Sequence, residues 1–425
     1  MADLEVIEIC AGAGGQALGL ERAGFEHALA VELDPAACAT LRANRPGWKV
    51  AEGDVADPTV WDPHAYAGVD LLAGGVPCPP FTVAGRQLGA TDERDLFAWA
   101  VELCGQMRPR AVLLENVRGL SMSRFGAYRQ HVLDRLRGLG YVPGWKLLNA
   151  SDFGVPQLRP RSVLVALRPE DAPWFRWPEP VSQPPLTVGQ ALGDLMGARG
   201  WPGTSWWASR ASRIAPTIVG GSKKHGGADL GPTRAKRAWA ELGVDGLGLA
   251  DQPPGPRDDP AMMPRLTCEM VARLQGWADE WAWEFTGRKT ARYRQVGNAF
   301  PPPVAEAVGG AIQRALRHEG VPCLPADESA HLHDPVFAVL RARAAFLTAA
   351  QIAAAVRSQA AARGGAALTG PAVLRRLQDL SRDFHVEIAT SGDGTAYRLG
   401  EFKAFLGQRD HVRHERFSSA RARIS

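Results

Sequence analysis

The chain has 425 residues, of which 45% are apolar, and it carries a formal net charge of +4 at pH 7. This length exceeds that of one typical hydrophobic core and predicts two or three domains. No apolar run approaches the length of a membrane span, and the N-terminus lacks the basic flank and apolar stretch of a signal peptide, so we expect no membrane association. The mild positive charge permits a nucleic-acid partner without requiring one.

Six cysteines are scattered along the chain, and no two of them form a CxxC pair. They are Cys10, Cys38, Cys78, Cys104, Cys268 and Cys323. This spacing predicts neither a metal site nor a disulfide framework. Reduced thiols fit a cytoplasmic protein.

The N-terminal residues predict a strand at 5–9, a glycine-containing turn at 10–15 and a helix at 16–23. Such a unit brings backbone amides and a helix N-terminus close to a ligand. A second strand ends at Glu32, where an acid commonly binds the hydroxyls of a cofactor ribose, and Asp54 follows a third strand at the same edge. The glycines do not follow the GxGxxG spacing, so an ordinary tight turn between strand and helix is the alternative.

Strands and helices continue to alternate as far as residue 166. The second strand is predicted at 28–31, and later strands at 69–73, 111–114 and 163–166. Helices are predicted at 95–107 and 124–139. This alternation indicates an α/β fold with a mostly parallel, doubly wound sheet covered by helices on both faces. In such a sheet, ligands bind at the carboxyl ends of the strands.

Cys78 lies directly after the strand predicted at 69–73, within the sequence Gly-Gly-Val-Pro-Cys-Pro-Pro-Phe. Each proline fixes its own φ angle and restricts the residue before it, so the thiol is held on a stiff loop. This position predicts a nucleophile that faces a ligand. A single cysteine is more often a buried structural residue, which is the alternative.

An acid and two arginines are predicted at the same edge of the sheet. Glu115 follows the strand at 111–114, and a carboxyl group withdrawn from water has a raised pKa and can donate a proton. Arg159 and Arg161 occupy alternate positions leading into the strand at 163–166, and arginines orient a carbonyl or phosphate by forked hydrogen bonds. The alternative for each residue taken singly is an ordinary one: Glu115 as a capping or ion-paired acid, and the arginines as solvated surface residues. Together with Cys78 they supply a nucleophile, an acid and an oxyanion-type donor.

At these residues the chain resembles the C5-cytosine-specific DNA methyltransferase family of the bacterial restriction–modification type, over roughly residues 4–318. Six segments occur in the family's order, at 11–15, 77–81, 115–117, 157–161, 265–277 and 292–302. The resemblance implies the Rossmann-like fold of methyltransferases that depend on S-adenosyl-L-methionine (AdoMet). It also implies AdoMet as the cofactor and double-stranded DNA as the substrate.

The resemblance further implies a mechanism in which the target cytosine is flipped out of the duplex. The Cys78 thiolate would add to C6 of the base and push electron density onto C5, which takes the methyl group. Glu115 would hold and protonate N3, while Arg161 and Arg159 would bind O2 and the nearby backbone.

The cofactor-binding residues implied by the same resemblance are Cys10, Gly12, Gly14, Gly15, Glu32, Asp54, Pro77 and Asn298. Glu32 is expected to bind the ribose and Asp54 the adenine edge. Cys10 stands where the family often has an aromatic residue near adenine. Pro79 replaces the usual glutamine, and Thr82 stands where serine is common. Because threonine also occurs there in the related group that methylates transfer RNA, an RNA cytosine-5 methyltransferase is the alternative.

Prolines, glycines and tryptophans interrupt the alternation between about residues 168 and 259, which is typical of the irregular target-recognition domain that the family inserts here. We expect the catalytic domain at 1–180 plus 281–320 and the target-recognition domain at 181–280. Its basic residues, expected to contact DNA phosphates or guanine edges, are Lys223, Lys224, Arg234, Lys236 and Arg237. A solvated basic loop is the alternative. The segment also resembles enzymes that act on GC-rich palindromes such as GCCGGC.

The last hundred residues predict a linker at 319–335 and then a small α+β domain. Its pattern is three helices, at 335–343, from 348 and at 369–380, followed by a hairpin at 385–390 and 395–399. This indicates a winged-helix-like domain at 336–405 and a basic, disordered tail at 406–425. Auxiliary DNA binding through Arg375, Arg376 and Arg382 and a packing or dimerisation role are equal alternatives.

The sequence therefore predicts a sequence-specific DNA (cytosine-5-)-methyltransferase that protects DNA from a partner restriction endonuclease. It is expected to act as a monomer on double-stranded DNA in the bacterial cytoplasm, associated with the nucleoid. Two alternatives stay open: an RNA methyltransferase of the same fold and a catalytically silent DNA-binding regulator. The intact set of Cys78, Glu115 and Arg161 argues against the silent regulator.

Overall fold

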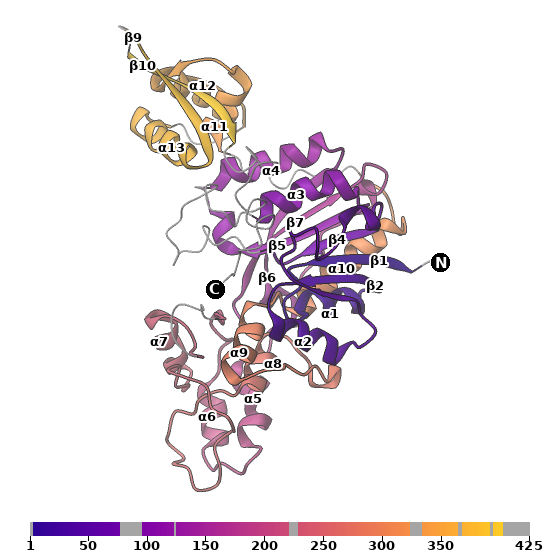
Figure 1. Ribbon diagram of the computed structural model, residues 1–425. Coiled ribbons are helices and arrows are strands. Elements are labelled where there is room, and N and C mark those ends of the chain that lie inside the picture. The colour runs from indigo at the N-terminus through magenta and orange to yellow at the C-terminus, as the bar shows by residue number, and fades with distance from the viewer. Residues whose placement is uncertain are drawn as a thin grey trace.

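The computed structural model describes residues 3–76, 96–122, 125–220, 228–323, 334–363, 368–391 and 394–402. Figure 1 shows three parts: a sheet flanked by helices at the centre, an inserted helical segment below it and a small C-terminal unit above it. The predicted site residues Pro77, Cys78, Lys223 and Lys224 lie outside the described residues. Within those described ranges, no helix is both long and apolar enough to traverse a bilayer. The same ranges hold no group of three or more His, Cys, Asp or Glu side chains placed to bind a metal ion.

The central sheet has seven strands in the order β3-β2-β1-β4-β5-β7-β6. The first five run parallel to one another, whereas β7 runs antiparallel to both β5 and β6. The strands are β1 Leu4–Ile9, β2 Phe25–Glu32, β3 Val50–Glu52, β4 Leu71–Gly74, β5 Ala111–Val117, β6 Val142–Asn149 and β7 Pro160–Leu167. This confirms the predicted doubly wound, mostly parallel sheet, and it brings the carboxyl ends of five strands to one edge.

The sequence pattern does not predict β6. Pro143 and Gly144 lie in its first half, and both residue types are poor strand formers. The strand is tolerated because it lies at the sheet edge, where one side of the backbone needs no partner strand. Trp145 anchors it, since the indole Nε1 donates to Ser162 Oγ on β7 at 2.7 Å.

Helices cover both faces of the sheet. On one face, α1 (Gly15–Arg22) packs against α10 (Pro302–Leu316), and both share an apolar core with Val6 of β1. α2 (Pro35–Asn44) follows β2 and begins after Asp34, whose Oδ1 accepts from the N–H of Ala36 at 2.9 Å. The sheet edge therefore adjoins the N-termini of two helices.

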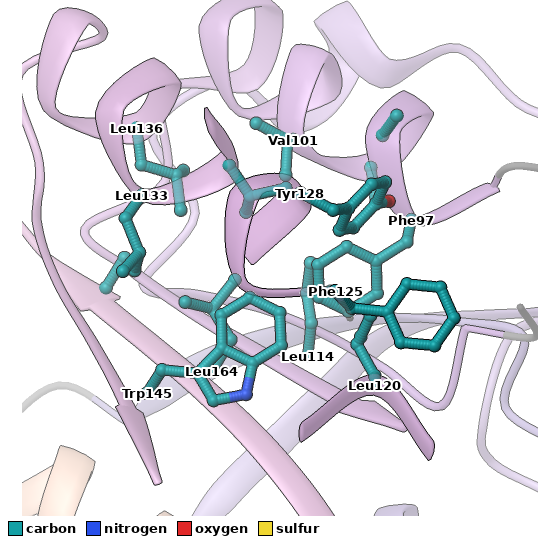
Figure 2. Packing of buried hydrophobic residues seen from close by; sticks show 14 of the residues in the cluster. Phe97, Val101, Leu114, Leu120, Phe125, Tyr128, Leu133, Leu136, Trp145 and Leu164 are labelled. Atoms are coloured by element: carbon teal, nitrogen blue, oxygen red, sulfur yellow. The ribbon is translucent and has the colours of Figure 1, made fainter. Parts of the chain in front are cut away.

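α3 (Leu96–Met107) and α4 (Gly126–Gly138) cover the opposite face, and the sequence predicts both within two residues of their observed ends. Figure 2 shows Phe97 and Tyr128 from these helices lying over Trp145 of the sheet. The ring centroids of Phe97 and Trp145 are 5.5 Å apart. Each large apolar side chain buried in this way contributes about 1.5–3 kcal/mol, so this layer holds the sheet in place behind the candidate site.

Residues 188–220 and 228–298, here called the insert, form a helical body with its own apolar core. Its helices are α5 Val188–Gly197, α6 Thr204–Arg210, α7 Thr233–Glu241, α8 Cys268–Leu274 and α9 Lys289–Asn298. Trp201, Trp207 and Trp239 are buried in this core, which accounts for the tryptophan-rich composition. Tyr293 and Val296 of α9 pack into the same core, so α9 joins the insert to the sheet domain.

The C-terminal unit contains the three helices and the hairpin that the sequence predicts. Its elements are α11 Pro335–Arg343, β8 Leu347–Thr348, α12 Ala349–Arg363, α13 Gly370–Asp383, β9 Phe384–Ser391 and β10 Gly394–Phe402. The strands form an antiparallel sheet in the order β8-β10-β9. Asp334 starts α11 by accepting from the N–H groups of Val336 and Phe337. This order of elements agrees with the predicted winged-helix-like fold.

The C-terminal unit docks on α4 (Figure 1). Phe337 of α11 and Phe384 of β9 belong to one continuous apolar core with α3 and α4. The ring of His131 on α4 meets Phe384 edge to face, with centroids 5.5 Å apart, and Arg341 forms an ion pair with Asp134. These contacts give the unit a packing role on the sheet domain.

The arginines predicted on the third helix differ in their surroundings. Arg375 is exposed, whereas Arg376 lies 3.6 Å from the carboxylate of Asp334. The side chain of Arg382 lies outside the described residues. Of the three, Arg375 is therefore the one whose surroundings in the structure suit contact with a nucleic acid.

His131 is expected to make stability depend on pH. Burial, and secondarily the nearby Arg341, lower its pKa to about 4, against the opposing charges of Asp134 and Glu102. Between this value and about 6.5 the unfolded state binds more protons, so the free energy of unfolding falls as pH falls through this range. The expected loss is on the order of 2–3 kcal/mol, since one pKa unit corresponds to about 1.4 kcal/mol.

Urea denaturation at pH 4.5 and pH 7 measures this dependence. His131→Phe retains the aromatic contact but cannot titrate, so its stability should change less with pH than that of the wild type. His64→Gln, at an exposed position, is the matched control. An unchanged pH dependence in His131→Phe would show that another group is responsible.

Candidate active site

A cavity of about 570 Å³ opens at the carboxyl ends of the parallel strands. Its wall combines the loop after β1, the ends of β2, β4 and β5, the start of β7 and one face of α9. The predicted site residues that line it are Cys10, Gly12, Gly15, Glu32, Asp54, Glu115, Arg161 and Asn298. Residues from across the first three hundred positions are therefore brought to one place, as predicted from the strand ends.

The loop after β1 needs glycine at particular positions. Gly12 and Gly14 have φ angles of +56° and +89°, in the left-handed region that favours glycine. A methyl group on Gly14 would also collide with the indole of Trp283, and one on Gly15 with the carbonyl of Phe300. Gly14 thus shapes the loop from outside the cavity wall. Cys10 also has a positive φ, 52°, although it is not glycine.

Glu32 holds the loop after β1 in place by a hydrogen bond to its backbone. Its Oε2 accepts from the N–H of Gly12 at 2.7 Å, and its Oε1 accepts from the N–H of Asp34 at 2.7 Å. Burial raises the pKa of Glu32, and these two backbone bonds oppose the shift. Asp54, on the neighbouring loop, accepts from the N–H of Ala56 at 2.9 Å. Backbone N–H groups thus fix both acids in the cavity wall, where they adjoin the space for a ligand.

Glu115 and Arg161 form the polar end of the cavity. Both are buried, and Arg161 Nε lies 2.7 Å from Glu115 Oε1, although the N–H is not aligned on the oxygen. Burial raises the pKa of Glu115, and Arg161 opposes that shift; burial likewise lowers the pKa of Arg161. A buried pair that lacks an aligned hydrogen bond can turn toward a polar ligand.

Asn116 connects this pair to the loop that carries Cys78. Its Nδ2 donates to the carbonyl of Val76 at 2.8 Å, two residues before the cysteine. A methyl group on Gly75 would lie 3.7 Å from Glu115 Oε2, so the root of the loop adjoins the acid. A role for Asn116 could not be predicted from the sequence, although it lies in the 115–117 segment that resembles the family.

Arg159 is placed differently from the prediction that it contacts the base. It is buried and does not belong to the cavity wall. Its Nη1 donates to the carbonyl of Ile218 at 2.6 Å, and its Nη2 to those of Gly297 and Ala299 at 2.7 and 2.9 Å. Both terminal nitrogens are thus engaged by main-chain oxygens. The side chain ties the backbone at residue 218 to the end of α9 instead of facing a substrate.

Gln157 and Tyr293 complete this arrangement, here called the insert clamp (Gln157, Arg159 and Tyr293). Gln157 Oε1 accepts from the N–H of Ile218 at 2.9 Å, and the Tyr293 hydroxyl donates to the carbonyl of Val219 at 2.8 Å. The clamp therefore binds the backbone just before the 221–227 segment, which contains the predicted DNA-contacting lysines. The backbone at 218 and 219 is 59 to 74 positions away from the clamp residues that bind it, which hides these contacts from a local pattern.

The basic residues predicted on α7 are partly engaged. Lys236 Nζ lies 2.7 Å from Asp229 Oδ2, so it carries an ion pair within the insert. Arg234 and Arg237 are exposed. Among the described basic residues that were predicted to contact DNA, these two arginines have the surroundings that best suit contact with a phosphate backbone.

The family model of the C-5 cytosine-specific DNA methylases matches residues 4–314. The chain is 61% identical over 425 residues, the full length of both proteins, to the type II methyltransferase M.NaeI of Lentzea aerocolonigenes. It is 51% identical over 316 residues to the type II methyltransferase M.NgoMIV of Neisseria gonorrhoeae, covering 74% of this chain and 98% of that relative.

A solved structure shares the fold. A prophage-encoded protein of E. coli described as a DNA modification methyltransferase aligns with a TM-score of 0.51 and 22% identity, over 74% of this chain and 99% of that one. The family model covers well over half of the chain, and both curated relatives cover more than two thirds of it. The chain therefore belongs to the C-5 cytosine-specific DNA methylase family.

Proposed function

We propose that this chain methylates C5 of a cytosine within one specific double-stranded DNA sequence, with AdoMet as the methyl donor. The observation that carries the proposal is the shared cavity: the Glu115–Arg161 pair, the glycine loop and Glu32 line one space at the root of the Cys78 loop. This supports a site in which a proton donor, an oxyanion-type donor and a nucleoside pocket act together with the nucleophile proposed for the loop after β4.

The residues of the cavity fit AdoMet. Glu32 is anchored by two backbone N–H groups and suits the ribose hydroxyls, and Asp54 suits the adenine edge. A methyl group on Gly12 would meet no atom within 4 Å, so the loop leaves room for a ligand against its backbone. Asn298 lines the same wall from α9. When bound, AdoMet supplies an electrophilic methyl group.

The proposed chemistry assigns one task to each group. The Cys78 thiolate forms a bond to C6 of a flipped-out cytosine, which makes C5 nucleophilic enough to take the methyl group. Glu115 holds and protonates N3, and Arg161 donates to O2, so the negative charge of the adduct is spread over both ends of the base. Loss of the C5 proton to a base, release of the Cys78 thiolate from C6 and return of the N3 proton to Glu115 restore the aromatic ring.

Arg159 acts in this proposal as a positioning residue. It fixes the insert relative to the cavity through main-chain oxygens, so that the loop with Lys223 and Lys224 and the helix with Arg234 and Arg237 meet the duplex in a fixed register. We propose that the recognised sequence is a GC-rich palindrome such as GCCGGC. Methylation would protect that sequence from a partner restriction endonuclease in the cytoplasm, the enzyme acting as a monomer on DNA.

Base-resolution mapping of cytosine methylation tests the proposal. A bacterial host free of cytosine methylation would express the wild type, Cys78→Ala or Cys323→Ala, the last as an exposed-cysteine control. The wild type and the control should methylate one sequence context completely, and Cys78→Ala should methylate none, because the adduct to C6 cannot form.

The other outcomes separate the alternatives. Methylation by folded Cys78→Ala would contradict the assigned nucleophile. No DNA methylation from abundant, folded wild type would favour the RNA methyltransferase, and transfer RNA would be mapped next. AdoMet binding without methylation of either nucleic acid would favour the silent regulator.

A further inference from the structure

The positive charge of the chain is concentrated at its C-terminal end. Residues 334–425 hold 14 Lys and Arg against 8 Asp and Glu, whereas residues 1–333 hold 35 against 37. The family model ends at residue 314, so this basic region lies beyond the part of the chain that matches the methylases. An excess of positive charge outside the catalytic part indicates an anionic partner of its own.

α13 turns one face to the core of the C-terminal unit and the other to solvent. Its buried apolar side chains recur at the spacing of one helical face and are Val373, Leu377 and Leu380. Arg376 is partly buried and forms an ion pair with Asp334, the residue that starts α11. These contacts fix the helix in the unit while its outer face stays uncovered.

The outer face of α13 carries side chains that suit the edges of DNA bases. Leu374 is 45% exposed, and Arg375 and Gln378 are exposed as well. An arginine donates two hydrogen bonds to guanine, and a glutamine forms two with adenine. An apolar side chain can contact the methyl group of thymine. Three kinds of base contact are therefore available on one face of one helix.

α13 also has the position of a recognition helix in the order of elements. It follows α12 and packs against it, and the hairpin of β9 and β10 comes next. In helix-turn-helix proteins the second of the two helices lies in the major groove and contacts base edges. The 14 residues of α13 span about 21 Å, which is enough to enter a groove about 12 Å wide.

A second copy of the chain is a poorer occupant of this face. Two such units in contact would bring like charges together, which costs free energy. α13 also contains no aromatic residue, whereas aromatic anchors are enriched in the interfaces between proteins. Double-stranded DNA matches both the charge of the region and the side chains of the face.

We propose that the C-terminal unit is a second site for double-stranded DNA, with α13 entering the major groove through Leu374, Arg375 and Gln378. In Figure 1 the unit and the insert lie at opposite ends of the molecule, with the sheet domain between them. The site is thus separate from Arg234 and Arg237 of the insert. It adds affinity for duplex DNA and takes no part in methyl transfer.

Fluorescence anisotropy of the full chain with a labelled duplex of random sequence, about 30 base pairs long, tests this site. Arg375→Glu should weaken binding about 10-fold and reduce its salt dependence, because a contact is lost and a repelling charge is added. Arg314→Glu makes the same change at an exposed position of α10 and is the matched control. Its affinity should stay within about twofold of the wild type.

Hydrogen exchange of the full chain with and without the same duplex locates the contact. The amides of α13 should exchange more slowly when the wild type binds DNA, and this slowing should be lost in Arg375→Glu. An affinity of Arg375→Glu equal to that of the control, or unchanged exchange in α13 of the wild type, would overturn the site. A DNA-free dimer that Arg375→Glu dissociates in sedimentation velocity would also overturn it and assign the face to a second copy.

Discussion

Glu115→Gln is expected to lower kcat for DNA methylation by about 100- to 10,000-fold, the range typical of a positioned proton donor. Glutamine has nearly the same shape and keeps an oxygen near Arg161, but it cannot give a proton to N3 of the base. Burial raises the pKa of Glu115, which favours the protonated form that the step requires. The loss should appear in kcat, because the proton is given in the transition state and not on binding.

Single-turnover methylation of an oligonucleotide duplex that contains the mapped site measures this effect. Glu52→Gln is the matched control, since Glu52 ends β3 at the same edge of the sheet with its side chain 39% exposed. AdoMet binding close to that of the wild type would show that the variant is folded. A rate within threefold of the wild type would contradict the role of Glu115.

Gly297→Ala is expected to reduce methylation about 100-fold, although residue 297 does not line the cavity. The added methyl group would lie 2.5 Å from the Cα of Gly220, and backbone on both sides prevents a cheap adjustment. The insert would have to move relative to the cavity, and a misplacement of about 1 Å can cost about 100-fold in rate. Specific DNA binding should weaken as well, because the same backbone leads into the lysine-containing loop.

Gly310→Ala on α10 is the matched control. There the nearest atom to the new methyl group would be the flexible end of Arg314, 3.5 Å away. Replacing a helical glycine by alanine without a clash stabilises a helix by about 0.5–1 kcal/mol. Methylation rates and thermal unfolding of both variants give the comparison. Equal activity in the two would show that the contact between Gly220 and Gly297 does not set the position of the insert.

The location of the candidate site could be predicted from the sequence because one geometric rule places it. Parallel strands end at one edge, so residues that follow separate strands, such as Glu32, Asp54 and Glu115, come together without knowledge of any long-range contact. The glycine-containing turn could be predicted for a different reason, because its residues are neighbours in the chain; its left-handed φ angles are seen only in the structure.

The parts that could not be predicted depend on distant partners. Arg159 and Arg161 stand at alternate positions and were expected on one face, but Arg159 precedes the first residue of β7 and turns toward carbonyls at 218, 297 and 299. These contacts are not encoded in a local pattern.

The insert clamp has a consequence for how new specificities arise. Arg159 and Tyr293 bind main-chain oxygens at 218 and 219, and every residue type offers that oxygen. Two positions restrict the choice of side chain: Gly220, pressed against Asn298 and Gly297, and Ile218, which is buried in the core of the insert. Recombination could therefore replace the recognition segment beyond this point while the catalytic residues, and the contacts that orient the new segment toward them, stay as they are. The residues that carry out the chemistry are therefore separate from the residues that can change when a different DNA sequence is recognised.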